Sequence, residues 1–155
     1  MGKLVAGLAL GFLISIASCG PAPVKKTEAP PPAPVKDNRI RLLAENQISV
    51  MLVHDHLLGK KVFPGGTLGS YDDHERKYQI FIIETDSAQD AAILLLDAKA
   101  MLTDPHYLAN MGGYFGVDDK KPFYMFADKQ YLAGIVGLEE DLADPMARQL
   151  ALRLR

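Results

Sequence analysis

The stretch YQIFIIETDSAQDAAILLLDAKAMLTD, residues 78–104, holds the two clearest secondary-structure signals in this chain. Its first part, Tyr78–Glu84, is rich in β-branched and aromatic residues and is apolar on both faces. A segment of this kind is typical of a strand in the middle of a sheet, because both of its faces must be covered. We therefore expect a central strand at residues 78–84.

The second part of the stretch, residues 87–104, has the strongest helical pattern in the chain. Its apolar residues recur at helical spacing and form one stripe; they are Ala91, Leu94, Leu95, Ala98, Met101 and Leu102. Asp86 and Gln89 have the spacing of a capping box at the start of this helix. Pro105 is expected to end it.

Two more strands and a helix are expected towards the C-terminus. The segments PFYMFA and YLAGIVGL, residues 122–127 and 131–138, flank a short polar tip and suit a β-hairpin. Asp144 followed by Pro145 predicts the start of a terminal helix. The apolar face of that helix comprises Met146, Ala147, Leu150, Ala151 and Leu154.

The segments upstream of residue 78 are harder to assign. Apolar spacing favours one helix over residues 39–59 with Gly59 as its C-cap, although the run Ile48–Val53 also suits a strand. Residues 62–77 contain a Pro-Gly-Gly turn and a charged tip, and are expected to form a loop. The order of elements predicts an α+β domain over residues 39–155, with a small, mainly antiparallel sheet and helices packed on one face.

Composition narrows the classes of partner. The chain has 155 residues, a formal net charge of −2 and a single cysteine. No basic excess points to nucleic acid, so no nucleic-acid partner is expected. One cysteine excludes an internal disulfide and a cysteine-based zinc cluster.

The N-terminus has the three parts of a secretory signal. Lys3 supplies the positive charge, residues 4–16 are apolar apart from glycine and one serine, and Ala17 and Ser18 are small. The apolar run is shorter than the about 20 residues that a spanning helix needs. Residues 1–18 are therefore predicted to be a signal peptide.

The segment IASC, residues 16–19, resembles the lipobox of bacterial lipoproteins. The resemblance implies cleavage before Cys19, attachment of diacylglycerol to its thiol and acylation of the new amino terminus. Two or more acyl chains give stable membrane anchoring. It also implies a location in the cell envelope, and in a Gram-negative cell Gly20, instead of an acidic residue, favours the outer membrane.

Residues 19–38 combine the lipidated cysteine with a proline-rich linker. The sequence PAPVKKTEAPPPAPVKDN is rich in Pro, Ala, Val and charge and cannot form a core. Its prolines favour an extended polyproline II spacer. Beyond it, the segments FPGGTLGSY, GGYFG and LAGIVGL together resemble an uncharacterised domain family of bacterial secreted and lipoprotein chains. That family implies no activity for any particular residue.

His54 and His56 are the sharpest candidates for metal ligands. On a strand they would share a face and could bind one ion, but on a helix they would diverge by about 200°. The alternative is that both histidines lie in the last turn of a helix, where a partly charged imidazole favours the negative end of the helix dipole. Asp72 and His74, in the charged segment DDHE at residues 72–75, could add ligands or be solvated loop charges.

The segment GGYFG, residues 112–116, lacks the pattern of a nucleotide-binding loop. It is read either as a bulged strand or turn, or as an aromatic tip at which Tyr114 and Phe115 contact a partner. No catalytic signature and no cofactor motif is recognised in the domain. The leading hypothesis is a membrane-anchored envelope lipoprotein with a non-enzymatic binding or accessory domain, held in the bilayer by Cys19 and contacting an envelope protein. The alternative is a metal-dependent hydrolase that uses His54 and His56.

Overall fold

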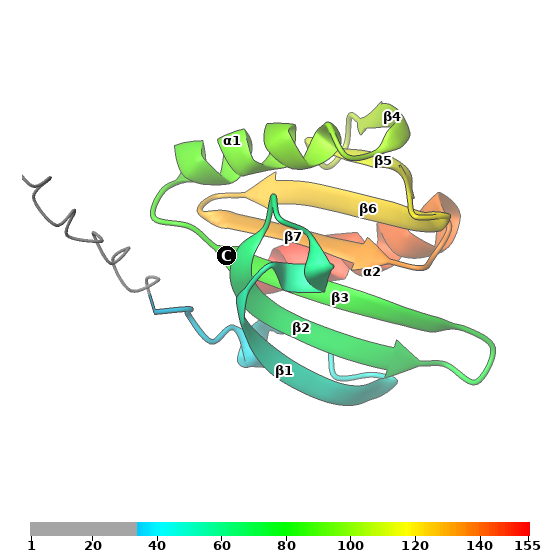
Figure 1. Cartoon of the computed structure of the whole chain (residues 1–155). Helices are drawn as coiled ribbons and strands as arrows, with labels where there is room; N and C mark the ends of the chain where they lie inside the picture. Colours follow the sequence, from blue (N-terminus) through cyan, green and yellow to red (C-terminus); the bar gives the residue numbers. More distant parts are fainter. Residues whose placement is uncertain (1–33) are drawn as a thin grey trace, which may run out of the picture. The chain divides into compact units, whose positions relative to one another are not determined.

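The computed structural model describes residues 34–155, which form a seven-stranded antiparallel sheet with two long helices (Figure 1). The strand order is β1-β2-β3-β7-β6-β5-β4. The strands are β1 (Gln47–Asp55), β2 (Pro64–Asp72), β3 (Lys77–Glu84), β4 (Thr103–Leu108), β5 (Gly113–Asp118), β6 (Lys121–Asp128) and β7 (Tyr131–Val136). The helices are α1 (Ala88–Lys99) and α2 (Glu140–Arg153), with short 3-10 turns η1 (Arg39–Arg41) and η2 (Leu57–Gly59).

The predicted α+β class with an antiparallel sheet is confirmed. β3 lies in the interior of the sheet, between β2 and β7, as its apolar sequence indicates. The hairpin of β6 and β7 forms around Asp128 and Tyr131, which face each other across the two strands. Every strand is antiparallel to its neighbours.

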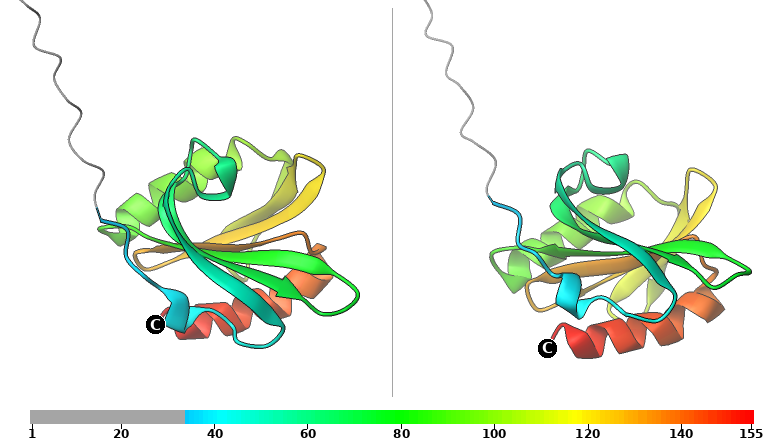
Figure 2. Two further views of the ribbon diagram at one scale, coloured as in Figure 1. Left: turned by 60° about the horizontal axis from the view of Figure 1, so that its bottom comes forward. Right: turned by 90° about the horizontal axis from the view of Figure 1, so that it is seen from below.

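Each long helix packs on one face of the sheet, and the two helices take opposite faces (Figure 2). The alternation of side chains along β3 shows this. Ile80 and Ile82 share a core with Ala147 and Leu150 of α2. Phe81, one residue away, belongs to the core of α1, together with Leu95 and Ala98. The structure differs here from the expectation that the helices share one face, because a strand that is apolar on both sides needs cover on both sides.

Two segments take a different secondary structure from the one expected. Residues 39–59 form η1, β1 and η2 instead of one helix, and residues 62–77 contain β2 instead of a loop. In both segments pairing between the strands decides the conformation, since β1 and β2 are joined along nearly their whole length. Tertiary pairing of this kind readily overrides local helix preference.

Helix boundaries also differ from the expectations. The N-cap of α1 is Ser87, whose hydroxyl accepts a hydrogen bond from the Asp90 backbone, instead of Asp86. Pro105 lies within β4, after the helix has already ended at Lys99. α2 begins at Glu140, so Pro145 lies inside the helix and Asp144 is not its N-cap.

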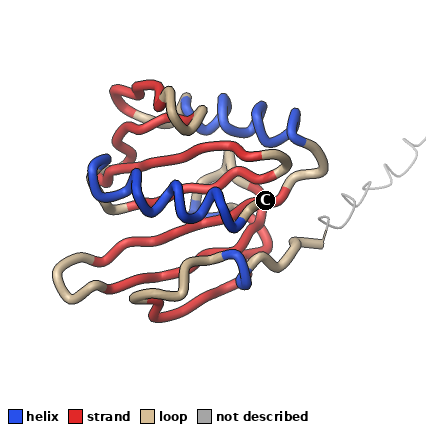
Figure 3. Tube along the Cα trace, turned by 180° about the vertical axis from the view of Figure 1, so that it is seen from behind, coloured by secondary structure: helices blue, strands red, loops and turns tan. Residues whose placement is uncertain are grey.

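The described part of the linker leads directly into the domain (Figure 3) and contacts it through Asn38. Asn38 is buried, and its backbone N–H donates a hydrogen bond of 2.9 Å to the hydroxyl oxygen of Thr67 on β2. Across residues 34–155, no helix is both long and apolar enough to cross a bilayer. The predicted signal peptide and most of the linker lie outside the described residues.

Candidate functional site

A groove of about 510 Å³ lies at one end of the sheet. We call it the sheet-end groove. Its lining comes from five strands and the residue that follows β7: Ile48, Ser70, Tyr71, Lys77, Tyr78, Gln79, Lys121, Pro122, Val136 and Gly137. The order of the strands therefore brings together residues that are up to 89 positions apart, from 48 to 137.

The floor of the sheet-end groove is a row of residues that face one another across three strands. Ser70 of β2 pairs with Gln79 of β3, and Gln79 pairs with Val136 of β7. Gln79 lies two residues before Phe81, so the two side chains point to the same face of the sheet, the face that α1 covers. Ser70 and Gln79 stay partly exposed, whereas Phe81 is fully buried. The groove thus offers a hydroxyl and an amide beside apolar surface.

Two lysines give the rim of this groove a positive charge. Lys77 begins β3 and Lys121 begins β6, and both side chains are exposed. Within the described part of the chain neither makes an ion pair, in contrast to Lys60, which binds both Asp118 and Asp119. The hydrogen bond of Lys60 to Asp118 is the largest cause that raises the pKa of Lys60, and its hydrogen bond to Asp119 is the next. Lys77 and Lys121 therefore remain available for an anionic group of a ligand.

A smaller cavity of about 100 Å³ continues the groove along the same face. Its lining shares Gln79, Lys121 and Val136 with the sheet-end groove. It adds apolar surface from Leu58 and Phe123, together with the ion-paired side chains of Lys60, Asp118 and Asp119. The two cavities together follow the sheet from β1 towards β6. An elongated ligand suits this shape better than a compact one.

Tyr71 and Tyr78 belong to the lining of the groove, and their rings pack against each other. The two rings stack with centroids 5.0 Å apart and lie within the core on the α2 side. Tyr71 donates its hydroxyl hydrogen to the carbonyl oxygen of Leu43 at 2.8 Å. The hydroxyl of Tyr78 is buried without a hydrogen-bond partner in the described chain, and burial raises the pKa of Tyr78.

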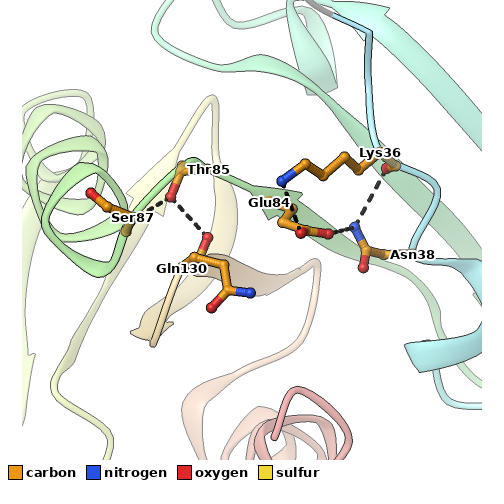
Figure 4. Close-up of polar contacts among 6 residues, drawn as sticks. All are labelled: Lys36, Asn38, Glu84, Thr85, Ser87 and Gln130. Carbon is orange, nitrogen blue, oxygen red and sulfur yellow. Dashed lines mark hydrogen bonds and ion pairs between the residues drawn. The ribbon is translucent and has the colours of Figure 1, made fainter.

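A second polar site lies where the linker meets the domain (Figure 4). Glu84, at the end of β3, accepts hydrogen bonds from Lys36 at 3.1 Å and from the side-chain amide of Asn38 at 3.1 Å. Thr85 bridges the start of α1 to the β6–β7 turn by donating to the carbonyl oxygens of Ser87 and Gln130. A hollow of about 310 Å³ beside them is lined mainly by acidic residues and by the linker itself. This site fastens the linker to the domain.

A third polar group lies at the start of α2. Nε2 of His106 on β4 is 2.7 Å from Oε2 of Glu140. Nearby, the carboxylate of Asp144 accepts hydrogen bonds from the hydroxyl of Tyr124 and from the guanidinium of Arg148. The adjoining hollow is open to solvent, and Asp144 and Arg148 in its lining bond to each other. This cluster fastens α2 to the sheet.

The two histidines predicted as metal ligands do not lie on one strand. His54 lies on β1, whereas His56 lies beyond the strand, where its backbone is left-handed with a φ of 52°. Nδ1 of His56 is 2.9 Å from Asp55. His74 and Asp72 belong to the turn between β2 and β3 and its approach. Among residues 34–155 there is no group of three or more His, Cys, Asp or Glu side chains that could hold a metal ion.

The predicted aromatic tip is part of the sheet. Tyr114 and Phe115 lie on β5 and are half-buried. The ammonium group of Lys99 lies 4.6 Å from the ring of Tyr114, and Phe115 packs against Tyr124. The structural reading of GGYFG holds for Gly112, which turns the chain with a φ of +63° before β5 begins.

Cys19 lies outside the described residues, so its lipidation stays a prediction. No family model, no curated protein and no solved structure matches this chain. Its resemblances to lipoproteins and to an uncharacterised domain family therefore also stay predictions. The sequence does not predict the sheet-end groove, because its residues carry no motif and only the order of the strands brings them together.

Proposed function

We propose that this protein is a membrane-anchored envelope lipoprotein whose domain is a non-enzymatic binding module. The sheet-end groove is its binding site. The N-terminal pattern that ends at Cys19 supports the anchor, and the proline-rich linker supports a spacer between bilayer and domain. In a Gram-negative cell, Gly20 supports the outer membrane as its location. A tether of this kind raises the effective concentration of the domain near the membrane.

The assignment of this binding site rests on one observation. The groove combines a cavity of about 510 Å³ with two lysines that have no ion-pair partner among residues 34–155. Ligand sites typically have volumes of about 300–1,000 Å³ and combine apolar surface with a few polar groups. Ser70 and Gln79 supply the hydrogen-bonding groups, and Ile48 and Val136 supply apolar surface. The ligand that fits is elongated, partly apolar and anionic, such as an extended acidic segment of an envelope protein.

The proposal is tested on the full chain, extracted from its own membranes in mild detergent. Native mass spectrometry should show a bound ligand, and the variant Lys77→Glu/Lys121→Glu should lose it. Lys61→Glu/Lys129→Glu is the matched control, because it makes the same charge change at exposed lysines that do not line the groove. Equal ligand occupancy in both variants would contradict the assignment of the groove.

The anchor is tested separately. Replacing Cys19 by Ser should move the exported protein from the membrane fraction to the soluble fraction, because the thiol that accepts the lipid is gone. Unchanged membrane retention of an exported Cys19→Ser protein would contradict the lipoprotein proposal. The metal-dependent hydrolase is not proposed further, since no observation in the described structure brings His54 and His56 to a common site.

A further inference from the structure

The two edges of the sheet differ in their protection against pairing with another strand. β1 and β4 are the outermost strands. β4 carries Pro105, a positive φ of 50° at Asp104 and a register shift between Thr103 and His106. Proline and irregular backbone at an edge are devices that prevent strand addition. β4 is therefore a closed edge.

β1 lacks these devices over most of its length. Gln47–Val53 contains no charged residue and no proline, and the register with β2 is regular from Ser49 to Val53. Met51 and Ile48 are 54% and 64% exposed. Apart from the ladder with β2, the backbone of residues 49–53 makes no hydrogen bond within the described part of the chain. An edge of this length and composition is a template for another strand.

We propose that a second copy of this chain occupies the β1 edge, with the two β1 strands antiparallel about a two-fold axis. This inference does not depend on the ligand of the sheet-end groove. An antiparallel pair that uses all nine residues of β1 joins Gln47 to Asp55 of the other copy, which places Met51 on the axis. The regular part, Ser49–Val53, has the same centre.

The charges on β1 are compatible with this self-pairing. Asp55 would lie opposite the uncharged Gln47, and His54 would lie opposite Ile48. Like charges that face each other across a strand pair are destabilising, and this pairing contains none. Closed two-fold dimers are also the commonest protein oligomers. Val50 and Val53 already pack against the two cores, so pairing would join the sheets of both copies without exposing either core.

The register provides a sharp test in the full chain in its own membranes. Residues that face each other in an antiparallel pair have Cα atoms about 4.5–5.5 Å apart, within the range of about 4.4–6.8 Å that a disulfide needs. Met51→Cys should therefore give a disulfide-linked dimer on mild oxidation. Ile48→Cys should not, although Ile48 is the more exposed residue, because its own copy would lie about 20 Å away at the rise of a strand.

Leu152→Cys, at an exposed apolar position on α2, controls for random collision, and the unmodified chain controls for Cys19. Dimers through Ile48→Cys or Leu152→Cys at equal yield would overturn the proposal, and so would the absence of a Met51→Cys dimer. A crosslink of Met51→Cys to a different polypeptide would also overturn it, since another protein would then occupy the edge. As a second readout, Met51→Lys should convert the detergent-extracted dimer to a monomer by light scattering, while Leu152→Lys should leave the dimer intact.

Discussion

The hydroxyl group of Tyr124 donates a hydrogen bond of 2.8 Å to Oδ1 of Asp144, and this bond ties the centre of β6 to α2. Nε of Arg148 donates to the other carboxylate oxygen at 2.7 Å. Tyr124 is fully buried. Burial is the largest cause that raises the pKa of its hydroxyl well above the usual range, and the hydrogen bond to Asp144 is the next. The three residues fix how α2 lies on the sheet.

Replacing Tyr124 by Phe should reduce the free energy of unfolding by about 1–2 kcal/mol, because a hydrogen bond to a charged group is lost while the ring stays in place. Urea unfolding of the full chain in detergent measures this change. Tyr107→Phe is the matched control, since Tyr107 is exposed and its hydroxyl makes no hydrogen bond among the described residues. Equal stability of the two variants would mean that the bond does not contribute.

The same contact predicts a dependence of stability on pH. Hydrogen bonds from Arg148 first, and from Tyr124 second, lower the pKa of Asp144 below its ordinary value of 3.8. A carboxylate with a lowered folded pKa stabilises the protein above its unfolded pKa, and this contribution is lost as the pH falls through the folded pKa. The stability advantage of the wild type over Asp144→Asn should therefore shrink below about pH 4. An advantage that stays constant from pH 6 to the acid limit of folding would contradict this prediction.

Neighbouring leucines on α1 should respond very differently to truncation. Leu95 is 6% exposed and packs on the sheet, whereas Leu96 is 57% exposed. Leu95→Ala should lower the free energy of unfolding by about 3 kcal/mol, and Leu96→Ala by less than about 0.5 kcal/mol. Leu95→Asp should prevent folding, because it buries an unpaired charge. Thermal unfolding of the three variants checks the orientation of α1.

The buried contact between linker and domain can be tested at Thr67. Its hydroxyl oxygen accepts the backbone N–H of Asn38, and both residues are buried. Thr67→Val keeps the shape but leaves that N–H without a partner, so the free energy of unfolding should fall by about 1–3 kcal/mol. Amide exchange around Asn38 should also become faster. Thr103→Val, at an exposed position of β4, should change neither quantity.

The sequence predicts most reliably the elements whose pattern is long and whose environment is uniform. β3 is apolar on both faces, and α1 has a single buried stripe, so both are recognisable without the fold. β2 is not, because Pro64, Gly65 and Gly66 read as a turn. A Cβ at Gly65 would lie 2.4 Å from the carbonyl oxygen of His54 on β1, so the glycine permits close strand pairing there instead of a turn.

α2 illustrates a different difficulty. The pair Asp144 and Pro145 has the composition of a helix start, yet the helix begins at Glu140. The side chain of Asp144 is engaged by Tyr124, a contact that only the packed structure creates. The sheet-end groove shows the same limit more strongly, since Ser70, Gln79 and Val136 become neighbours only through the order of the strands.

The central claim, that the sheet-end groove binds a ligand, is tested most directly by photocrosslinking in intact cells. A photoreactive residue in place of Gln79 on the groove floor should give a discrete adduct on irradiation, and the same residue in place of the exposed Gln89 on α1 should not. Adding Lys77→Glu/Lys121→Glu should abolish the Gln79 adduct, whereas Lys61→Glu/Lys129→Glu should preserve it. An adduct that survives reversal of the groove lysines, or that forms equally from position 89, would contradict the account.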